Sequence, residues 1–314
     1  MTLGRLLIDF NDYHRTVFLA GTGRSGTTWV ANIINYSNSY RLMFEPFNPN
    51  AVDIVGHFRY RQYLRPENKD PRYLEPANTI LSGLVRNEWI DRLNRKVIAR
   101  KRLVKDIRAH HLLKWIKSNF PEIPIILLLR HPCAVAHSKM KLEWDTQIEE
   151  FLSQDELVED FLTPFKNEIE NVQTVFEKHI IQWCIENFVP LTQFEDDEIH
   201  FAFYENFCRN PEYELDRLFT FLNEAYDSSI YDAVRRPSPL SRKQSAVFIG
   251  DDLVESWKRH IKDKQIHRSV EILSWFGLDS IYSDDPMPLI NGKANPLAPQ
   301  SPKPARHEKA TRSN

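Results

Sequence analysis

The sequence predicts an α/β fold in which a central parallel sheet is flanked by helices. Short apolar runs alternate along the chain with segments of helical spacing, and a polar loop follows each run. The clearest strand, 123–130, is almost continuously apolar, as expected at the buried centre of a parallel sheet. In such sheets ligands bind outside the carboxyl ends of the strands. The side chains expected to converge there are those of Arg24, Glu45, Lys105, Arg130 and Tyr204.

A glycine-rich turn follows the first predicted strand, 17–20, and leads into a predicted helix over 25–36. This order of strand, turn and helix directs backbone N–H groups and a helix N-terminus toward a bound anion. Glycines let the backbone approach the ligand, hydroxyls donate to it, and an arginine adds a fixed positive fork. The alternative is a turn that binds nothing. The predicted phosphate cradle comprises Gly23, Arg24, Ser25, Gly26, Thr27, Thr28 and Trp29.

The turn departs from the P-loop pattern G-x-x-x-x-G-K-[ST] at one position. Gly21 and Gly26 have the required spacing, and Thr28 occupies the Ser/Thr position. Thr27, however, stands where the lysine belongs. Enzymes that act on nucleoside triphosphates need that lysine at the β- and γ-phosphates, together with Mg²⁺. Because the lysine is missing and Arg24 lies inside the turn, we expect a different phosphate group.

The remaining elements are predicted from hydrophobic periodicity and from the positions of proline and glycine. Further strands are expected at 40–44, 101–105 and 199–204. Helices are expected at 80–93, at 110–117, from Pro132 onward, within 145–188 with a break at Pro164, at 211–222 and at 253–276.

These elements predict a single domain over 1–283. Within it, 48–96 should form a long excursion over the carboxyl edge of the sheet, where binding loops usually lie. Its polar residues would either shape a substrate pocket or solvate a loop. The composition of 284–314 predicts a disordered tail. The residues of the excursion that suit a polar or glycan substrate are Arg59, Tyr60, Arg61 and Tyr63.

Composition narrows the function classes. The 314 residues carry a net charge of −2, so no global field attracts nucleic acid or an anionic membrane. Three widely separated cysteines predict free thiols in a reducing compartment. The sequence contains no apolar run of about 18 residues, and its first apolar stretch is too short for a signal peptide. We expect a cytoplasmic protein without a membrane or nucleic-acid partner, and the oligomeric state stays open.

A second phosphate motif follows strand 123–130. Arg130 ends this strand, where few partners are available to an arginine. Pro132 suits a first helical turn, and Ser138 lies about two turns into the helix. The pair of segments Gly23-Arg-Ser-Gly-Thr-Thr-Trp29 and Leu127-Leu-Leu-Arg-His-Pro-Cys-Ala-Val-Ala-His-Ser138 resembles the sulfotransferases that use 3′-phosphoadenosine-5′-phosphosulfate (PAPS).

The resemblance implies a P-loop NTPase-like sulfotransferase fold, with PAPS as co-substrate and no metal. It implies that the glycine-rich turn holds the 5′-phosphosulfate, while Arg130 and Ser138 hold the 3′-phosphate. Arg242 and Lys243 echo a later contact to the 3′-phosphate, or they belong to a solvated loop. Tyr204 would close over the nucleotide, or it packs at the end of a strand.

The general base is less clearly indicated. Phe44-Glu-Pro46 and Val104-Lys-Asp106 look closer to the carbohydrate and bacterial branches than to the phenol- and steroid-sulfating enzymes. The latter have a Lys-Thr-His motif whose histidine is the base, and Asp106 and Ile107 stand there instead. Candidates for the base are, in order, Glu45, Asp106, and His110 or His111.

Each candidate also has a structural interpretation. Glu45 could be a loop-capping or arginine-paired carboxylate, and Asp106 an N-cap or an ion-pair partner. The two histidines could be a helix-face pair with one solvated member. Arg24 is expected to stabilise charge on the departing 5′-phosphate. Lys105 could steer the sulfate oxygens, or it is a surface lysine.

The resulting prediction is transfer of a sulfuryl group from PAPS to a hydroxyl or amine, with in-line geometry and a carboxylate base. The acceptor would be a carbohydrate or a small-molecule natural product. One alternative is a P-loop-like kinase or phosphotransferase, which Thr27 disfavours. Another is a non-catalytic nucleotide-binding homologue.

Overall fold

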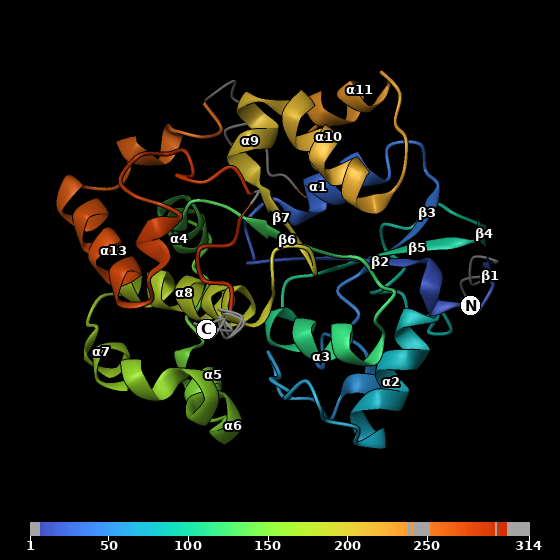
Figure 1. Ribbon diagram of the computed structural model, residues 1–314, viewed down its shortest axis with the longest axis horizontal. Helices are drawn as coiled ribbons and strands as arrows, with labels where there is room; N and C mark the ends of the chain where they lie inside the picture. Colours follow the sequence, from blue (N-terminus) through green and yellow to red (C-terminus); the bar gives the residue numbers. More distant parts are fainter. Residues whose placement is uncertain (1–6, 238–239, 241–251, 293, 300–314) are drawn as a thin grey trace, which may run out of the picture.

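The computed structural model describes residues 7–237, 240, 252–292 and 294–299. Its main sheet is parallel throughout, with the strand order β3-β5-β2-β6-β7 (Figure 1). Two short strands, β1 and β4, pair with each other in parallel. The predicted α/β fold class is therefore confirmed. The strands are β1 (Ile8–Asp9), β2 (Thr16–Gly21), β3 (Tyr40–Phe44), β4 (Ile98–Ala99), β5 (Lys101–Asp106), β6 (Ile125–Leu129) and β7 (His200–Phe203).

Helices cover both faces of this sheet (Figure 1). One face packs against α1 (Thr27–Ile34), α10 (Pro211–Leu222) and α11 (Ile230–Arg235). The other packs against α2 (Pro71–Leu81), α3 (Leu113–Asn119) and α8 (Val175–Gln193). The remaining helices are α4 (Pro132–Met140), α5 (Ile148–Leu152), α6 (Asp155–Leu157), α7 (Lys166–Asn171), α9 (Tyr204–Arg209) and α13 (Asp263–Trp275).

The apolar run of β6 is explained by burial on both faces. Ile125 and Leu127 belong to the core cluster on the α3 and α8 side, whereas Ile126 and Leu128 belong to the cluster on the α1 and α10 side. Successive strand residues point to opposite faces, so a strand covered on both sides is apolar at every position. Both clusters are needed to hold β6 and its neighbour β2 at the centre of the sheet.

One helix lies earlier than predicted. The structure has α2 at Pro71–Leu81 in place of the predicted helix at 80–93. Asp70 caps its N-terminus by accepting from the backbone N–H of Arg72, and Pro71 occupies the first helical position. Gly83, with a φ of +78°, then turns the chain away. The apolar residues after Gly83 had suggested a helix that this turn excludes.

Two long helical predictions are divided in the structure. The region 145–188 contains α5, α6, α7 and most of α8. Helix α8 begins at a capping box formed by Thr174 and Glu177 and continues to Gln193. The predicted helix at 253–276 becomes a 3₁₀ turn, Ser256–Arg259, followed by α13.

The C-terminal segment also differs from its prediction. Residues 284–292 and 294–299, which we expected to be disordered, lie against the domain. Asn295 is buried, and its Nδ2 donates to the carbonyls of Leu191 at 2.6 Å and Phe194 at 3.0 Å. An Arg217 Nη2 donates to the Gly292 carbonyl at 2.6 Å. These tertiary hydrogen bonds hold a polar, proline-rich segment in one conformation, which its composition does not indicate.

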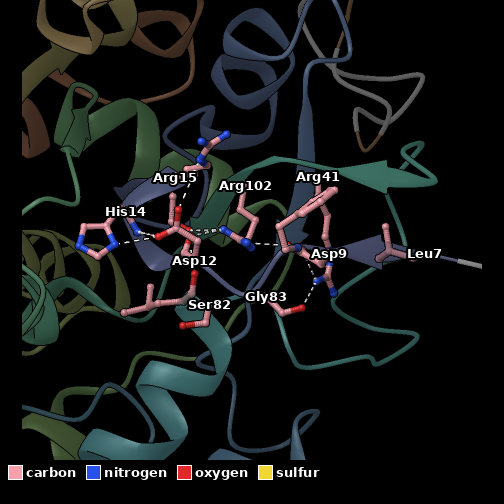
Figure 2. Close-up of polar contacts among 12 residues, drawn as sticks. Leu7, Asp9, Asp12, His14, Arg15, Arg41, Ser82, Gly83 and Arg102 are labelled. Carbon is pink, nitrogen blue, oxygen red and sulfur yellow. Dashed lines mark hydrogen bonds and ion pairs between the residues drawn. The ribbon is translucent and has the colours of Figure 1, made fainter.

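A buried ion cluster fixes the N-terminal segment to the edge of the sheet (Figure 2). Asp9 lies between Arg41 and Arg102, at 3.0 Å and 2.5 Å, and the three side chains are almost fully buried. Arg41 also pairs with Asp91 at 2.9 Å and donates to the Gly83 carbonyl at 2.6 Å. The cluster thereby ties β1, β3, β5 and the turn after α2 together.

We expect Asp9→Asn to destabilise the protein by about 3–5 kcal/mol, because it leaves the buried Arg102 without a compensating carboxylate and Arg41 with Asp91 alone. Urea unfolding would measure this loss. Asp12→Asn is the matched control, since its carboxylate pairs only with the exposed His14 and Arg15 and should matter little. Equal stability of the Asp9→Asn variant and wild type would contradict the assigned role.

Candidate active site

A cavity of about 580 Å³ opens at the carboxyl ends of the strands. The strand order predicts that residues from the ends of β2, β3, β5, β6 and β7 converge there, and the structure brings them together. Further lining comes from the N-terminus of α1, one face of α4 and the segments 89–92 and 253–260. The five residues predicted to converge, Arg24, Glu45, Lys105, Arg130 and Tyr204, all line this cavity.

The turn between β2 and α1 has a conformation that favours glycine. Gly26 is the N-cap of α1 with a φ of +93°, and a Cβ at this position would lie 2.6 Å from the Tyr204 ring. Arg24 also has a positive φ of +80°. Backbone strain of this kind at a residue with a side chain is frequently found at functional sites. Thr27 and Thr28 begin α1, whose first N–H groups have no partner within the helix.

Arg24 connects the two phosphate motifs. Its Nε donates to Ser138 Oγ at 3.0 Å, and its carbonyl accepts from Arg130 Nη1 at 3.0 Å. The Arg130 guanidinium lies 4.0 Å from the centre of the Tyr204 ring. Ser25 Oγ and Arg130 Nε are buried without a hydrogen-bond partner among the described residues. Of these two residues only Arg130 lines the cavity, whereas Ser25 lies beneath it. Since buried polar atoms are normally paired, Arg130 Nε gives the site unused capacity for a ligand.

Glu45 lies between two cations at the end of β3. Lys105 Nζ is 2.5 Å from Glu45 Oε1, and Arg108 Nη1 pairs with Oε2. Burial raises the pKa of Glu45, but Lys105 and Arg108 outweigh it and hold this pKa below its usual value. The φ of Glu45 is +46°, not the extended value that the following Pro46 favours. Glu45 is therefore ionised at neutral pH and is arginine-paired, as the structural alternative expected.

The structure does not bring Asp106 to the cavity, contrary to its selection as second candidate for the base. Its side chain is fully buried, and its oxygens accept from the backbone N–H groups of Phe47 at 3.0 Å and Arg108 at 2.7 Å. Burial raises the pKa of Asp106. Asp106 therefore satisfies backbone N–H groups of the segment after β3 and of the segment after β5, and this role explains the carboxylate at the end of β5.

His110 and His111 also lie away from the cavity. Both are buried in the 3₁₀ turn His110–Leu112 that precedes α3. Burial lowers the pKa of His110 to about 3 and that of His111 to about 4. The expectation that one member of the pair is solvated is wrong, because the helical stripe here is packed against α8.

The excursion over 48–96 contributes Trp89 and Arg92 to the cavity. Tyr60 accepts at its hydroxyl from Arg108 Nε at 2.7 Å but does not line the cavity. The other polar residues expected there contact the helical region 148–193 instead, and so hold the excursion in place. These residues are Arg59, Arg61 and Tyr63.

Sequence reasoning missed several lining residues. Helix α4 presents Ala134 and His137 to the cavity beside the predicted Ser138, and Lys141 follows with the same helical spacing. That spacing of three and four residues was a readable signal once Ser138 had been singled out. The other missed lining residues belong to segments without a recognisable motif, and only the tertiary structure brings them to the cavity. They are Trp89, Arg92, Arg108, Trp144, Trp257 and His260.

Three further predictions concern the late basic residues, a metal ion and the membrane. Arg242 and Lys243 lie outside the described residues. In the described part of the chain, no three His, Cys, Asp or Glu side chains are grouped so that they could hold a metal ion. None of the described helices combines the length and the apolar character needed to cross a bilayer.

A family model described as "Sulfotransferase family" matches residues 16–228, and the chain belongs to this family. The nodulation protein NoeE of Sinorhizobium fredii (strain NBRC 101917 / NGR234) is 28% identical over 144 residues, which cover 40% of this chain and 31% of NoeE. The match thus spans about a third of that relative. The family predicted from the two phosphate motifs is confirmed.

Two solved structures are similar to this chain. The sulfotransferase domain from the curacin biosynthetic pathway is 17% identical with a TM-score of 0.46, and the match covers 82% of this chain and 96% of that domain. Mouse sulfotransferase SULT7A1 complexed with PAP is 16% identical with a TM-score of 0.43, and the match covers 87% of each chain.

We expect Gly26→Ala to destabilise the protein by at least about 1–2 kcal/mol, the cost of a left-handed residue with a side chain. The clash with the Tyr204 ring adds to this cost. Gly56→Ala is the control for backbone conformation, because Gly56 has a φ of −59°; a Cβ there would lie 3.1 Å from the Asp53 carbonyl oxygen, a milder approach than the one at Gly26. Urea unfolding would compare the two variants, and equal losses would contradict the account of the turn. Adding Tyr204→Leu to Gly26→Ala should recover only the part due to the clash.

Proposed function

We propose that this protein transfers a sulfuryl group from PAPS to a hydroxyl or amine of a carbohydrate or small-molecule acceptor. The observation that carries the proposal is the contact between the two phosphate motifs. Arg24 donates to Ser138 and accepts from Arg130, so the glycine-rich turn and the second motif form one wall of the cavity. Membership of the sulfotransferase family supports the same class of reaction.

The cavity over β2, β6 and β7 suits a nucleotide with two separate anionic groups. The turn offers the first N–H groups of α1 and the threonine hydroxyls to one group. Arg130 and Ser138 are available to the other, with Tyr204 stacked on the Arg130 guanidinium. The Arg130 Nε, which has no partner among the described residues, is consistent with an occupied site in which a ligand pairs with it.

Arg24 would stabilise the negative charge that develops on the 5′-phosphate as the bond to sulfur breaks. A preorganised donor acts strongly in a site that excludes water, and removing one commonly lowers the rate about 100- to 1000-fold. Lys105 lies at the end of β5, beside the turn on β2, where it can steer the sulfate oxygens. The hydrogen bond from Arg24 Nε to Ser138 Oγ already orients the Arg24 side chain for its proposed role.

Glu45 would accept the proton of the acceptor hydroxyl as the new oxygen–sulfur bond forms. It is ionised because Lys105 and Arg108 lower its pKa. It lines the cavity on the side opposite the nucleotide motifs, at the end of β3. This position allows the acceptor to approach the sulfur opposite the departing phosphate.

We expect 3′-phosphoadenosine 5′-phosphate (PAP) to bind tightly without metal, and Arg130→Ala to weaken that binding at least about tenfold through loss of charge-assisted hydrogen bonds. Isothermal calorimetry would measure both affinities. Arg95→Ala is the matched control, because Arg95 is exposed and does not line the cavity.

Two outcomes would contradict the proposed function, the first through the donor and the second through the transfer itself. Binding of ATP with Mg²⁺ in place of PAP would favour a phosphotransferase with a degenerate P-loop. Tight PAP binding without sulfuryl transfer to any tested hydroxyl or amine would favour a non-catalytic homologue.

We expect Glu45→Gln to lower the rate of sulfuryl transfer about 100- to 10,000-fold, as loss of a general base commonly does, with PAP affinity retained. Wild-type activity should persist down to pH 4.5, because the pKa of Glu45 lies below that usual value. Arg108→Gln removes one cation, so the pKa of Glu45 should rise and the acidic limb should move to higher pH. The pH dependence of kcat/KM would measure this shift. An acidic limb that is the same in both proteins would exclude Glu45 as the base.

A further inference from the structure

The end of the cavity over β3 and β5 is distinct from the nucleotide side. Its described charged residues are Glu45 and Lys105 at the strand ends, Arg108 after β5, and Arg92 from the excursion. We call this region the distal end. Because β3 and β5 lie on the opposite side of β2 from β6 and β7, the distal end is where an acceptor would enter beside the turn.

The distal end has an excess of positive charge. Three cations, Arg92, Lys105 and Arg108, face one acid, Glu45. The Glu45 carboxylate is already shared between Lys105 and Arg108. No carboxylate of the described residues lies within ion-pair distance of Arg92, whose contacts are with aromatic rings. The described part of the chain therefore supplies no carboxylate to this guanidinium at the distal end.

Arg92 is exposed, and contacts with two aromatic rings define the position of its guanidinium. Its guanidinium lies 4.7 Å from the centre of the Phe44 ring and 4.8 Å from that of Trp89. The Trp89 Nε1 in turn donates to the Glu45 carbonyl at 3.2 Å. Stacking on aromatic faces holds a guanidinium without using its hydrogen-bond donors. Arg92 thus keeps its donor fork for an anionic group next to the residue proposed as the base.

We infer that the acceptor carries an anionic group, a carboxylate, sulfate or phosphate, close to the hydroxyl that receives the sulfuryl group. This inference rests on the proposed function and narrows its acceptor. Arg92 would bind the anion through paired N–H donors, which suit the planar or tetrahedral oxygens of such groups. An acceptor with an ammonium group would be repelled by Arg92, Lys105 and Arg108, so the inference favours hydroxyl over amine acceptors.

The test uses binding to the PAP-saturated protein. The carboxylate probe is 4-nitrophenyl β-D-glucuronide, and its neutral match is 4-nitrophenyl β-D-glucoside. Glucose 6-sulfate and glucose 6-phosphate, each compared with glucose, distinguish the other anions. The ammonium probe is 4-nitrophenyl 2-amino-2-deoxy-β-D-glucoside. At least one anionic probe should bind about tenfold or more tightly than its neutral match, as a charge-assisted hydrogen bond commonly gives. The ammonium probe should bind most weakly.

Arg92→Gln should remove this preference, leaving the affinities for the neutral probes and for PAP unchanged. Arg95→Gln is the matched control, an exposed arginine three residues along that does not line the cavity, and it should bind every probe as wild type does. Calorimetry gives both affinities from the same samples.

Three outcomes would overturn the inference. They are equal binding of each anionic probe and its neutral match, no binding of any anionic probe to the PAP-bound protein, and an undiminished anion preference in Arg92→Gln. In each case retained PAP binding shows that the proposed donor survives and that only the acceptor assignment has failed. Loss of PAP binding by the wild-type protein would instead remove the proposed function and the inference with it.

Discussion

The position of β2 at the centre of a parallel sheet determines where every candidate residue lies. It pairs with β5 on one side and β6 on the other, and the register Ala20 to Asp106 and Ala20 to Leu127 brings the three strand ends to the same edge of the sheet. The glycine-rich turn therefore opens between Lys105 and Arg130. Buried apolar layers on both faces hold this register, because a slip of one residue would move every side chain to the opposite face.

A network of buried charged and polar side chains lies behind the turn. Glu186 of α8 pairs with Arg61 and accepts from Gln182 at 2.7 Å. Lys139 of α4 is also fully buried, and its Nζ has no hydrogen-bond partner among the described residues. Lys139 neighbours Ser138, and Asn187 of α8 donates to Thr22 at 3.2 Å in the turn itself. Charges buried in this way contribute more to a defined geometry than to net stability. The network supports both phosphate motifs from behind.

Prediction from the sequence succeeded where local pattern determines the structure. The strand 40–44 and the helix 211–222 have the predicted bounds, and the turn and the Arg130–Ser138 spacing identified the family. It ranked Glu45 above Asp106 but kept both as candidates, since both are carboxylates at strand ends and only the folded structure shows which of them lines the cavity. Arg92 belongs to no recognised motif, and only the folded chain brings it and Trp89 against Phe44 at the end of β3.

The electrostatics of Glu45 link the two ends of the cavity. A carboxylate held between Lys105 and Arg108 has a low pKa, and a weakly basic group takes a proton from a hydroxyl inefficiently. Anions change this balance, because they attract the same two cations. A sulfate near Lys105 and an anionic acceptor near Arg92 and Arg108 would each reduce the positive field at Glu45. The proposed base would then be most basic when both substrates are bound, which couples proton transfer to the presence of the acceptor.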